Sequence, residues 1–222
     1  MRTSGPDMRK AFAGSALALL CVVTLASCTS DDSASKSADP CGISPSSEEE
    51  SLVREVLGKE DFATKAYGST SVLVDKMERA LPKMPKRDMF YTNACGYSVG
   101  GEQGDSGVTF LAGWFLRTSE LPSFPNDVSY ELNGARGVAR SGSSTLLVPC
   151  DLPGELGAQS QKVWLTADTT YRFSPSRPDV NQATRDQRMT LTYLMARRIT
   201  EALGCENKPL EQAPVVKPLP SP

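Results

Sequence analysis

Residues 89–117, MFYTNACGYSVGGEQGDSGVTFLAGWFLR, decide the fold that this sequence predicts. Aromatic and β-branched residues dominate both ends of the stretch, at 89–99 and 108–117, and a glycine-rich segment separates them. Runs of this composition favour β-strands, and a short glycine-containing connection favours an antiparallel hairpin. Three later runs, at residues 128–132, 144–150 and 162–173, predict further strands by the same reasoning.

Helix signals lie on both sides of these strands. Ser47 and Glu50 form a capping-box pattern before an apolar face that ends at Gly58, which predicts a helix over residues 47–58. Residues 72–81 have the spacing of a second helix, and residues 181–203 predict a long helix. Together these elements predict an α+β fold, in which helices pack on one face of an antiparallel sheet.

The first 27 residues have the organisation of a signal peptide. A basic start precedes an apolar run at residues 11–26, which is too short for a membrane span. The run ends in Leu25-Ala26-Ser27-Cys28, which resembles the lipobox of bacterial lipoproteins. Cys21 competes for this role, but Leu20 precedes it where a small side chain is required. We therefore expect lipid attachment to Cys28 and an anchor on the extracytoplasmic face of the cell membrane.

Composition divides the rest of the chain into three parts. Residues 28–40 are rich in Ser, Asp and Ala, without a large apolar side chain, and predict a disordered tether behind the lipidated cysteine. Residues 41–208 hold the predicted elements and are expected to form a single α+β domain. Residues 209–222, PLEQAPVVKPLPSP, contain five prolines and predict a disordered tail.

The mature chain would be mildly acidic. Cleavage after residue 27 leaves 21 basic and 25 acidic residues, a net charge of −4. We therefore expect no nucleic-acid partner, because nucleic acids are bound through an excess of Lys and Arg. The expected partners are the membrane, through the lipid on Cys28, and an envelope protein or a small ligand.

Four further cysteines indicate two disulfides, because an even number in an exported chain is typically paired. They are Cys41, Cys95, Cys150 and Cys205. Spacing does not select a pairing. We favour Cys41 with Cys95 and Cys150 with Cys205, since each pair would join a strand to the end of a helix in its own half. The alternative joins Cys41 to Cys205 and Cys95 to Cys150.

The sequence offers no catalytic residue, metal ligand set or cofactor site. The chain contains no histidine and no Cys-x-x-Cys spacing, which excludes Ser-His-Asp triads and zincin motifs and disfavours a metal site. A hydrolase that works through two carboxylates remains the alternative function, with Asp168 and Glu131 as unpaired candidates. Trp164 shares a strand face with Thr166 and Asp168, so we expect any binding site there first.

The order of these features resembles a group of streptomycete lipoproteins. The likeness rests on the lipobox, the polar tether, Cys41-Gly42 before a helix, strands with Cys95 and Cys150, and the ending Leu-Gly-Cys-Glu-Asn at residues 203–207. Asp39-Pro40-Cys41 is also similar to the opening of a domain family in actinobacterial lipoproteins. The resemblance implies an exported, lipid-anchored domain and no functional residue beyond the cysteines. The resulting expectation is a non-enzymatic binding or interaction module of the cell envelope.

Overall fold

The computed structural model describes residues 39–100, 106–173 and 180–220. The predicted signal peptide, the lipid site at Cys28 and the tether up to residue 38 therefore lie outside the described residues. Within the described ranges, no helix is both long and apolar enough to cross a membrane.

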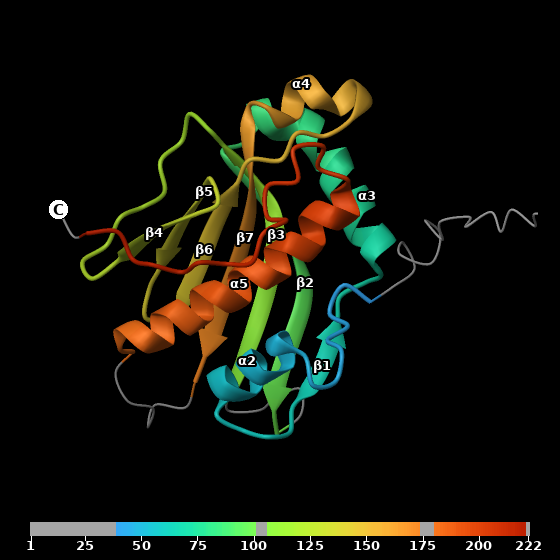
Figure 1. The fold of residues 1–222 in the computed structure, drawn as a ribbon. Coiled ribbons are helices and arrows are strands. Elements are labelled where there is room, and N and C mark those ends of the chain that lie inside the picture. Colours follow the sequence, from blue (N-terminus) through green and yellow to red (C-terminus); the bar gives the residue numbers. More distant parts are fainter. Residues whose placement is uncertain (1–38, 101–105, 174–179, 221–222) are drawn as a thin grey trace, which may run out of the picture. The chain divides into compact units, whose positions relative to one another are not determined.

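Seven strands within the described residues form one antiparallel sheet, in the order β1-β2-β3-β7-β6-β5-β4 (Figure 1). They are β1 (Ala63–Ala66), β2 (Met89–Val99), β3 (Ser106–Leu116), β4 (Val128–Leu132), β5 (Ala135–Ala139), β6 (Ser143–Val148) and β7 (Val163–Arg172). The predicted pairing of β2 with β3 is confirmed, and its register runs from Met89 opposite Phe115 to Val99 opposite Ser106.

The helical elements are α2 (Glu48–Leu57), α3 (Thr70–Ala80), η1 (Leu81–Lys86), η2 (Gly154–Leu156), α4 (Gly157–Ser160) and α5 (Gln182–Leu203). The helices α2 and α5 begin and end at the residues that the sequence marks, whereas α3 begins two residues earlier than predicted and the short helices η1, η2 and α4 were not predicted. The Ser47 hydroxyl accepts the Glu50 N–H at the start of α2, and the Asn181 side chain accepts the Thr184 N–H at the start of α5. Gly58 and Gly204 end these helices in the left-handed conformation, at φ 68° in both cases.

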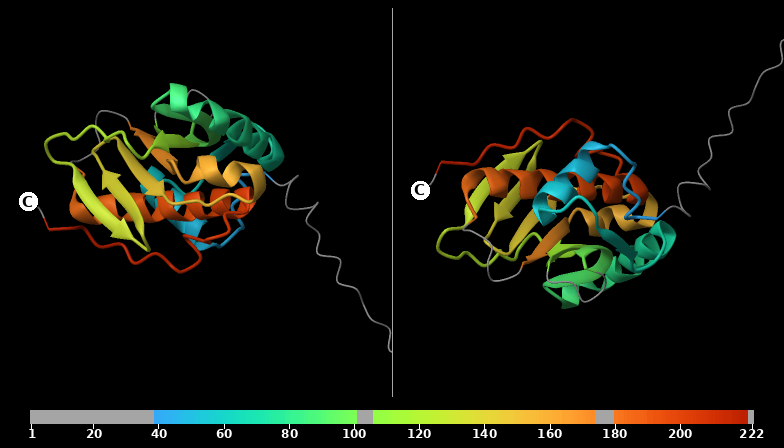
Figure 2. Two further views of the ribbon diagram at one scale, coloured as in Figure 1. Left: turned by 90° about the horizontal axis from the view of Figure 1, so that it is seen from above. Right: turned by 90° about the horizontal axis from the view of Figure 1, so that it is seen from below.

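One hydrophobic core lies between the sheet and α5, which crosses the strands with α2 beside it (Figures 1 and 2). Trp114 of β3 is fully buried there, and its indole N–H donates to the Met77 carbonyl of α3 at 2.9 Å. This bond ties α3, which lies next to β2, to the same core. The predicted α+β arrangement is therefore confirmed.

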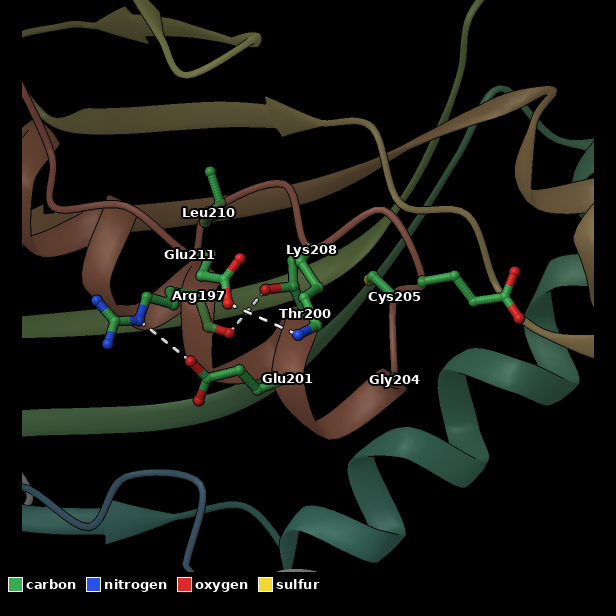
Figure 3. A pocket seen from close by; sticks show the side chains of 9 residues that line it. Arg197, Thr200, Glu201, Gly204, Cys205, Lys208, Leu210 and Glu211 are labelled. Carbon is green, nitrogen blue, oxygen red and sulfur yellow. Dashed lines mark hydrogen bonds and ion pairs between the residues drawn. The ribbon is translucent and has the colours of Figure 1, made fainter.

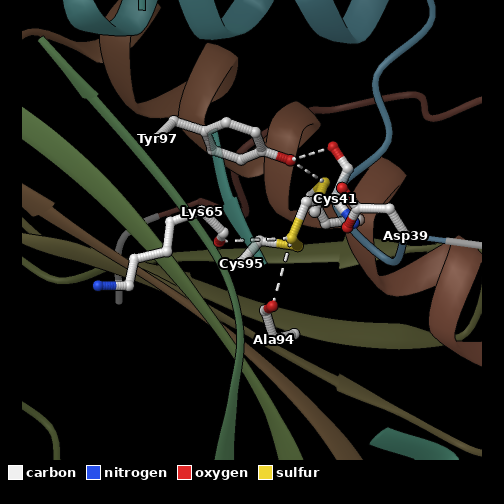
Figure 4. The surroundings of a disulfide bond; sticks show 7 residues. Asp39, Cys41, Lys65, Ala94, Cys95 and Tyr97 are labelled. Atoms are coloured by element: carbon white, nitrogen blue, oxygen red, sulfur yellow. Dashed lines mark hydrogen bonds between the residues drawn. A yellow bond between two sulfur atoms is a disulfide. The ribbon is translucent and has the colours of Figure 1, made fainter. Parts of the chain in front are cut away.

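Both disulfides have the pairing that the sequence favoured. Cys41 is bonded to Cys95, with 5.3 Å between the Cα atoms, and Cys150 is bonded to Cys205, with 5.1 Å. Figure 4 shows that the first bond lies beside the buried Tyr97, whose hydroxyl donates to the Cys41 carbonyl at 3.2 Å. Each bond links a strand region to a segment next to a helix in its own half of the chain.

The C-terminal segment packs on the domain, so the prediction of a disordered tail is wrong for residues 209–220. Leu210 is buried, and the Tyr193 hydroxyl donates to the Gln212 carbonyl at 2.9 Å. Further along, Pro218 forms a bridge with Tyr130, and the Leu219 N–H donates to the Ser129 carbonyl at 2.8 Å. Prolines are tolerated beside an edge strand because they need not donate to the ladder. The domain therefore extends beyond residue 208.

Candidate ligand-binding face

Strand alternation separates the side chains of the sheet into two faces. Thr169 of β7 touches α5, because its hydroxyl accepts a hydrogen bond from Thr192 at 2.8 Å. Residues one position away point to the opposite side, which we call the outer face. Trp164, Thr166 and Asp168 lie on this face together, as the sequence predicted. The ladder places Thr166 between Gly113 of β3 and Leu147 of β6, and places Asp168 between Leu111 and Thr145.

Asp168 lies at the centre of the outer face and is only partly exposed. Its carboxylate accepts hydrogen bonds from the hydroxyls of Thr145 at 2.7 Å and Thr170 at 3.2 Å. Burial raises the pKa of Asp168, although both hydrogen bonds and the charge of Arg140 lower it. Loss of hydration therefore outweighs the local stabilisation of the carboxylate.

Tyr91 of β2 lies on the outer face in line with Gly113 of β3 and Thr166 of β7. Its hydroxyl lies 3.5 Å from that of Thr166, two strands away, because Gly113 on the strand between them has no side chain. Burial raises the pKa of the Tyr91 phenol, and Asp168 and Arg140 also act on it electrostatically. Tyr91 and Asp168 therefore belong to one polar cluster that shares the influence of Arg140.

Two arginine guanidinium groups lie over the indole ring of Trp164. Arg117 lies 4.4 Å from the centre of its ring and Arg136 lies 5.6 Å from it. The position of Arg117 is fixed by a hydrogen bond of 2.9 Å from its Nε to the Val163 carbonyl. Such stacking orders the guanidinium groups. This end of the outer face therefore combines an aromatic ring with positive charge.

A groove of about 460 Å³ crosses β1, β2, β3 and β7 at the other end of the outer face. Gly96 and Gly107 lie in its floor, Thr109 and Thr170 supply hydroxyl groups, and Tyr67 forms a wall with 40 % of its surface exposed. The groove continues into the polar cluster, because Thr170 both lines it and donates to Asp168. The sequence placed Asp168 on this face but did not indicate the groove.

A second hollow, of about 420 Å³, lies at the end of α5 near Cys205 (Figure 3). Arg197 forms an ion pair with Glu201 at 3.1 Å, and Lys208 forms one with Glu211 at 3.6 Å. Four of the five charged groups that line this hollow therefore already form ion pairs with one another. This leaves the outer face as the stronger candidate site.

The two carboxylates that the sequence offered for hydrolysis are not brought together. Glu131 lies on β4, opposite Arg136 of β5 in the ladder, whereas Asp168 lies on β7. These strands are three steps apart in the sheet. Steps of about 4.8 Å separate the strands by about 14 Å, beyond the 5–9.5 Å or so between the two carboxyl groups of glycosidases. Among the described residues, no group of three or more acidic or cysteine side chains could hold a metal ion.

Comparison with protein-family models, with curated proteins and with solved structures finds no match for this chain. Its structure is that of a disulfide-linked α+β domain with an antiparallel sheet and a long C-terminal helix.

Proposed function

We propose that this chain is a lipid-anchored envelope protein whose domain binds a small hydroxyl-rich ligand in the groove of the outer face. The main support for a ligand site is the groove that Gly96 and Gly107 leave on the sheet, which leads to Asp168. The proposed anchor rests on the lipobox at Leu25-Ala26-Ser27-Cys28.

Glycine at both positions keeps the groove open. A Cβ atom at Gly96 would lie 3.6 Å from the ring of Tyr67, and one at Gly107 would lie 3.3 Å from the Tyr97 carbonyl. Glycine inside a strand lowers stability, by about 0.5–1 kcal/mol relative to alanine in regular structure. Where it occurs in a strand, it often marks the close approach of a ligand or another backbone.

The groups around the groove suit a ligand that is apolar on one side and hydroxylated at its rim. The exposed ring of Tyr67, with the Lys65 ammonium 5.8 Å from its centre, offers an edge and part of a face for apolar contact. The hydroxyls of Ser98, Thr109 and Thr170 can donate and accept hydrogen bonds. Sugars combine these two properties. A few convergent polar groups beside an aromatic wall are typical of ligand pockets.

Asp168 supports the same interpretation. Burial raises the pKa of this carboxyl group, so the ionised form destabilises the folded domain at neutral pH. Groups with such shifted pKa values concentrate at functional sites. Its hydrogen bond from Thr170 connects it to the groove. We expect a ligand hydroxyl to donate to this carboxylate in the complex.

The test is binding of soluble peptidoglycan fragments to the purified chain, followed by native mass spectrometry. We expect a reproducible added mass, which Gly96→Val removes because its side chain fills the groove. Gly142→Val is the matched control, since no heavy atom lies within 4 Å of a Cβ at Gly142. Binding that survives Gly96→Val, or no bound mass with any fragment, would contradict the proposed ligand site.

The anchor is tested separately by replacing Cys28. We expect the wild-type chain to partition with membranes and Cys28→Ala to be released into the soluble fraction, because two acyl chains are needed for stable anchoring. Complete membrane retention of Cys28→Ala would contradict the anchor and leave the ligand site untouched.

A further inference from the structure

A second groove, of about 360 Å³, lies between β2 and the α3–η1 segment and carries a concentration of positive charge. Four cationic side chains line it, Lys76, Arg79, Lys83 and Arg87, and no carboxylate is among the lining residues. The mature chain as a whole is expected to be acidic, so this positive surface is a local feature.

Three of these four cations have no acidic partner in the part of the chain that the structure describes. Arg79 forms an ion pair with Asp75 one turn earlier on α3, whereas no ion pair joins Lys76, Lys83 or Arg87 to a carboxylate there. Like charges that face one hollow repel each other, and a bound anion would relieve this repulsion.

Two of the cations extend from a backbone segment that is held in place. Residues 81–86, LPKMPK, form η1, and both prolines restrict φ. Leu81 and Met84 are buried, and the Arg87 N–H donates to the Met84 carbonyl at 2.8 Å. Lys83 and Arg87 therefore extend from an anchored turn, which lowers the entropy lost when a ligand orders them.

The edge of β2 adds a backbone donor to the groove. β1 pairs only with residues 95–98 of β2, so no strand covers residues 89–93 on that side. The Asp88 carbonyl accepts the Leu116 N–H at 3.0 Å. Alternation in an antiparallel ladder then turns the N–H of Tyr91, three residues on, away from β3 and towards the groove. Tyr91 is one of the lining residues.

We infer that this groove binds a phosphate group, carried either by an anionic lipid headgroup or by a soluble phosphorylated molecule. Phosphate oxygens accept strong hydrogen bonds from Arg, Lys and backbone N–H groups, which are the donors assembled here. A lipid source would place the α3–η1 segment against the membrane.

The test measures lysine acetylation rates, residue by residue, in the full chain reconstituted into phosphatidylcholine vesicles. One arm adds inorganic phosphate, and the other replaces part of the lipid with phosphatidylglycerol. At a concentration about ten times Kd, occupancy should slow acetylation of Lys76 and Lys83 about tenfold. Protection by phosphate in the first arm identifies a soluble source, and protection by phosphatidylglycerol alone identifies the membrane. Lys59 and Lys162 lie outside the lining and serve as internal controls.

Arg87→Gln separates the groove from general surface charge. It leaves Lys76 and Lys83 as reporters, and we expect it to abolish their protection. Arg197→Gln is the matched control on the exposed surface of α5, where Arg197 pairs with Glu201, and it should leave protection unchanged. Absence of protection in both arms, equal slowing at Lys59 and Lys162, or full protection in Arg87→Gln would each overturn the inference.

Discussion

At the scale of single residues, Gly113 determines how closely β2 and β3 approach. A Cβ atom at this position would lie 1.7 Å from the Phe90 carbonyl oxygen on the adjacent strand. The contact is with backbone, so no side-chain rotation relieves it. The same missing side chain lets Tyr91 reach across to Thr166 at 3.5 Å. One glycine therefore serves both the sheet and the polar cluster.

We predict that Gly113→Ala destabilises the domain, at the upper end of the roughly 1–3 kcal/mol typical of overpacking, because two strands must move apart. Chemical denaturation followed by tryptophan fluorescence measures this free energy of unfolding. Gly142→Ala, at a site with no atom within 4 Å of the added Cβ, should change it by less than about 0.5 kcal/mol. Equal stability of the two variants would show that the strands do not approach so closely.

The raised pKa of Asp168 predicts how the free energy of unfolding changes with pH. Its pKa is raised above the ordinary 3.8 by burial, so the folded chain holds the proton more tightly than the unfolded chain does. The contribution of this residue to stability is therefore present below pH 3.8 and is lost as pH rises through the folded pKa. An asparagine side chain at this position would be neutral throughout, and its amide would still reach the hydroxyls of Thr145 and Thr170.

We therefore expect the free energy of unfolding of Asp168→Asn, minus that of the wild type, to increase as pH rises from about 3.5 to about 7. Urea denaturation at several pH values measures both. Taking the difference removes the titration of other carboxylates, because both chains share them. A difference that stays constant with pH would mean that folding does not raise the pKa of Asp168.

At the scale of elements, the sequence predicts a helix or strand correctly where neighbouring residues contain its cap or its apolar periodicity. The caps at Ser47 and Asn181 and the apolar stripe of α5 are properties of neighbouring residues. β5 was missed although Asn133-Gly134 before it has the positive φ angles, 50° and 81°, of a tight hairpin turn. β1 offered no such signal, since all four of its residues are exposed.

The candidate site was only half predictable for a related reason. Alternation within β7 is local, and it placed Trp164, Thr166 and Asp168 on one face. The groove depends on the register of four strands, which brings Gly96 and Gly107 to its floor, and no single segment encodes that register. The order of the C-terminal segment could not be predicted locally, because its prolines indicate an extended chain, whereas tertiary contacts decide whether that chain is ordered.

Removal of residues 209–222 should therefore destabilise the domain. Burial of a leucine side chain such as Leu210 contributes about 1.5–3 kcal/mol, and the hydrogen bonds of Gln212 and Leu219 each add about 1 kcal/mol. Hydrogen exchange at β4 should also increase, because the segment bridges to Tyr130 on that edge strand. A chain shortened only by residues 221 and 222 is the control. Unchanged melting of the longer truncation would show that the segment contributes no stability.

At the scale of the whole domain, polar groups inside the core fix how α5 sits on the sheet. The hydroxyls of Ser144 and Thr192 lie 2.6 Å apart, and Tyr171 lies 2.9 Å from Ser144. Burial raises the pKa of Tyr171 to about 12, so it remains a neutral hydrogen-bonding group. Each of these groups needs its partners because an unsatisfied buried hydroxyl costs free energy. The network therefore favours one position of the helix over neighbouring registers.

The two disulfides act on different parts of this domain. Their loops span 54 and 55 residues and do not overlap in sequence. Cys41–Cys95 holds the segment before α2 against β2, and Cys150–Cys205 holds the end of β6 against the end of α5. Each bond should therefore restrict the unfolded chain independently of the other.

This independence predicts additive losses of stability. The chain-entropy model gives about 4 kcal/mol for closing a loop of this length. Replacing Cys41 and Cys95 by Ala should lower the free energy of unfolding by about that amount, and the same change at Cys150 and Cys205 should do likewise.

Because the loops share no residues, removal of both bonds should cost the sum, about 8 kcal/mol, which approaches the total stability of an ordinary domain. We therefore expect the four-alanine chain to be largely unfolded at about 25 °C by circular dichroism, while each two-alanine chain folds with a lower melting temperature. A four-alanine chain that melts like the two-alanine chains would show that the bonds constrain the same part of the unfolded ensemble, contrary to their separate places in the structure.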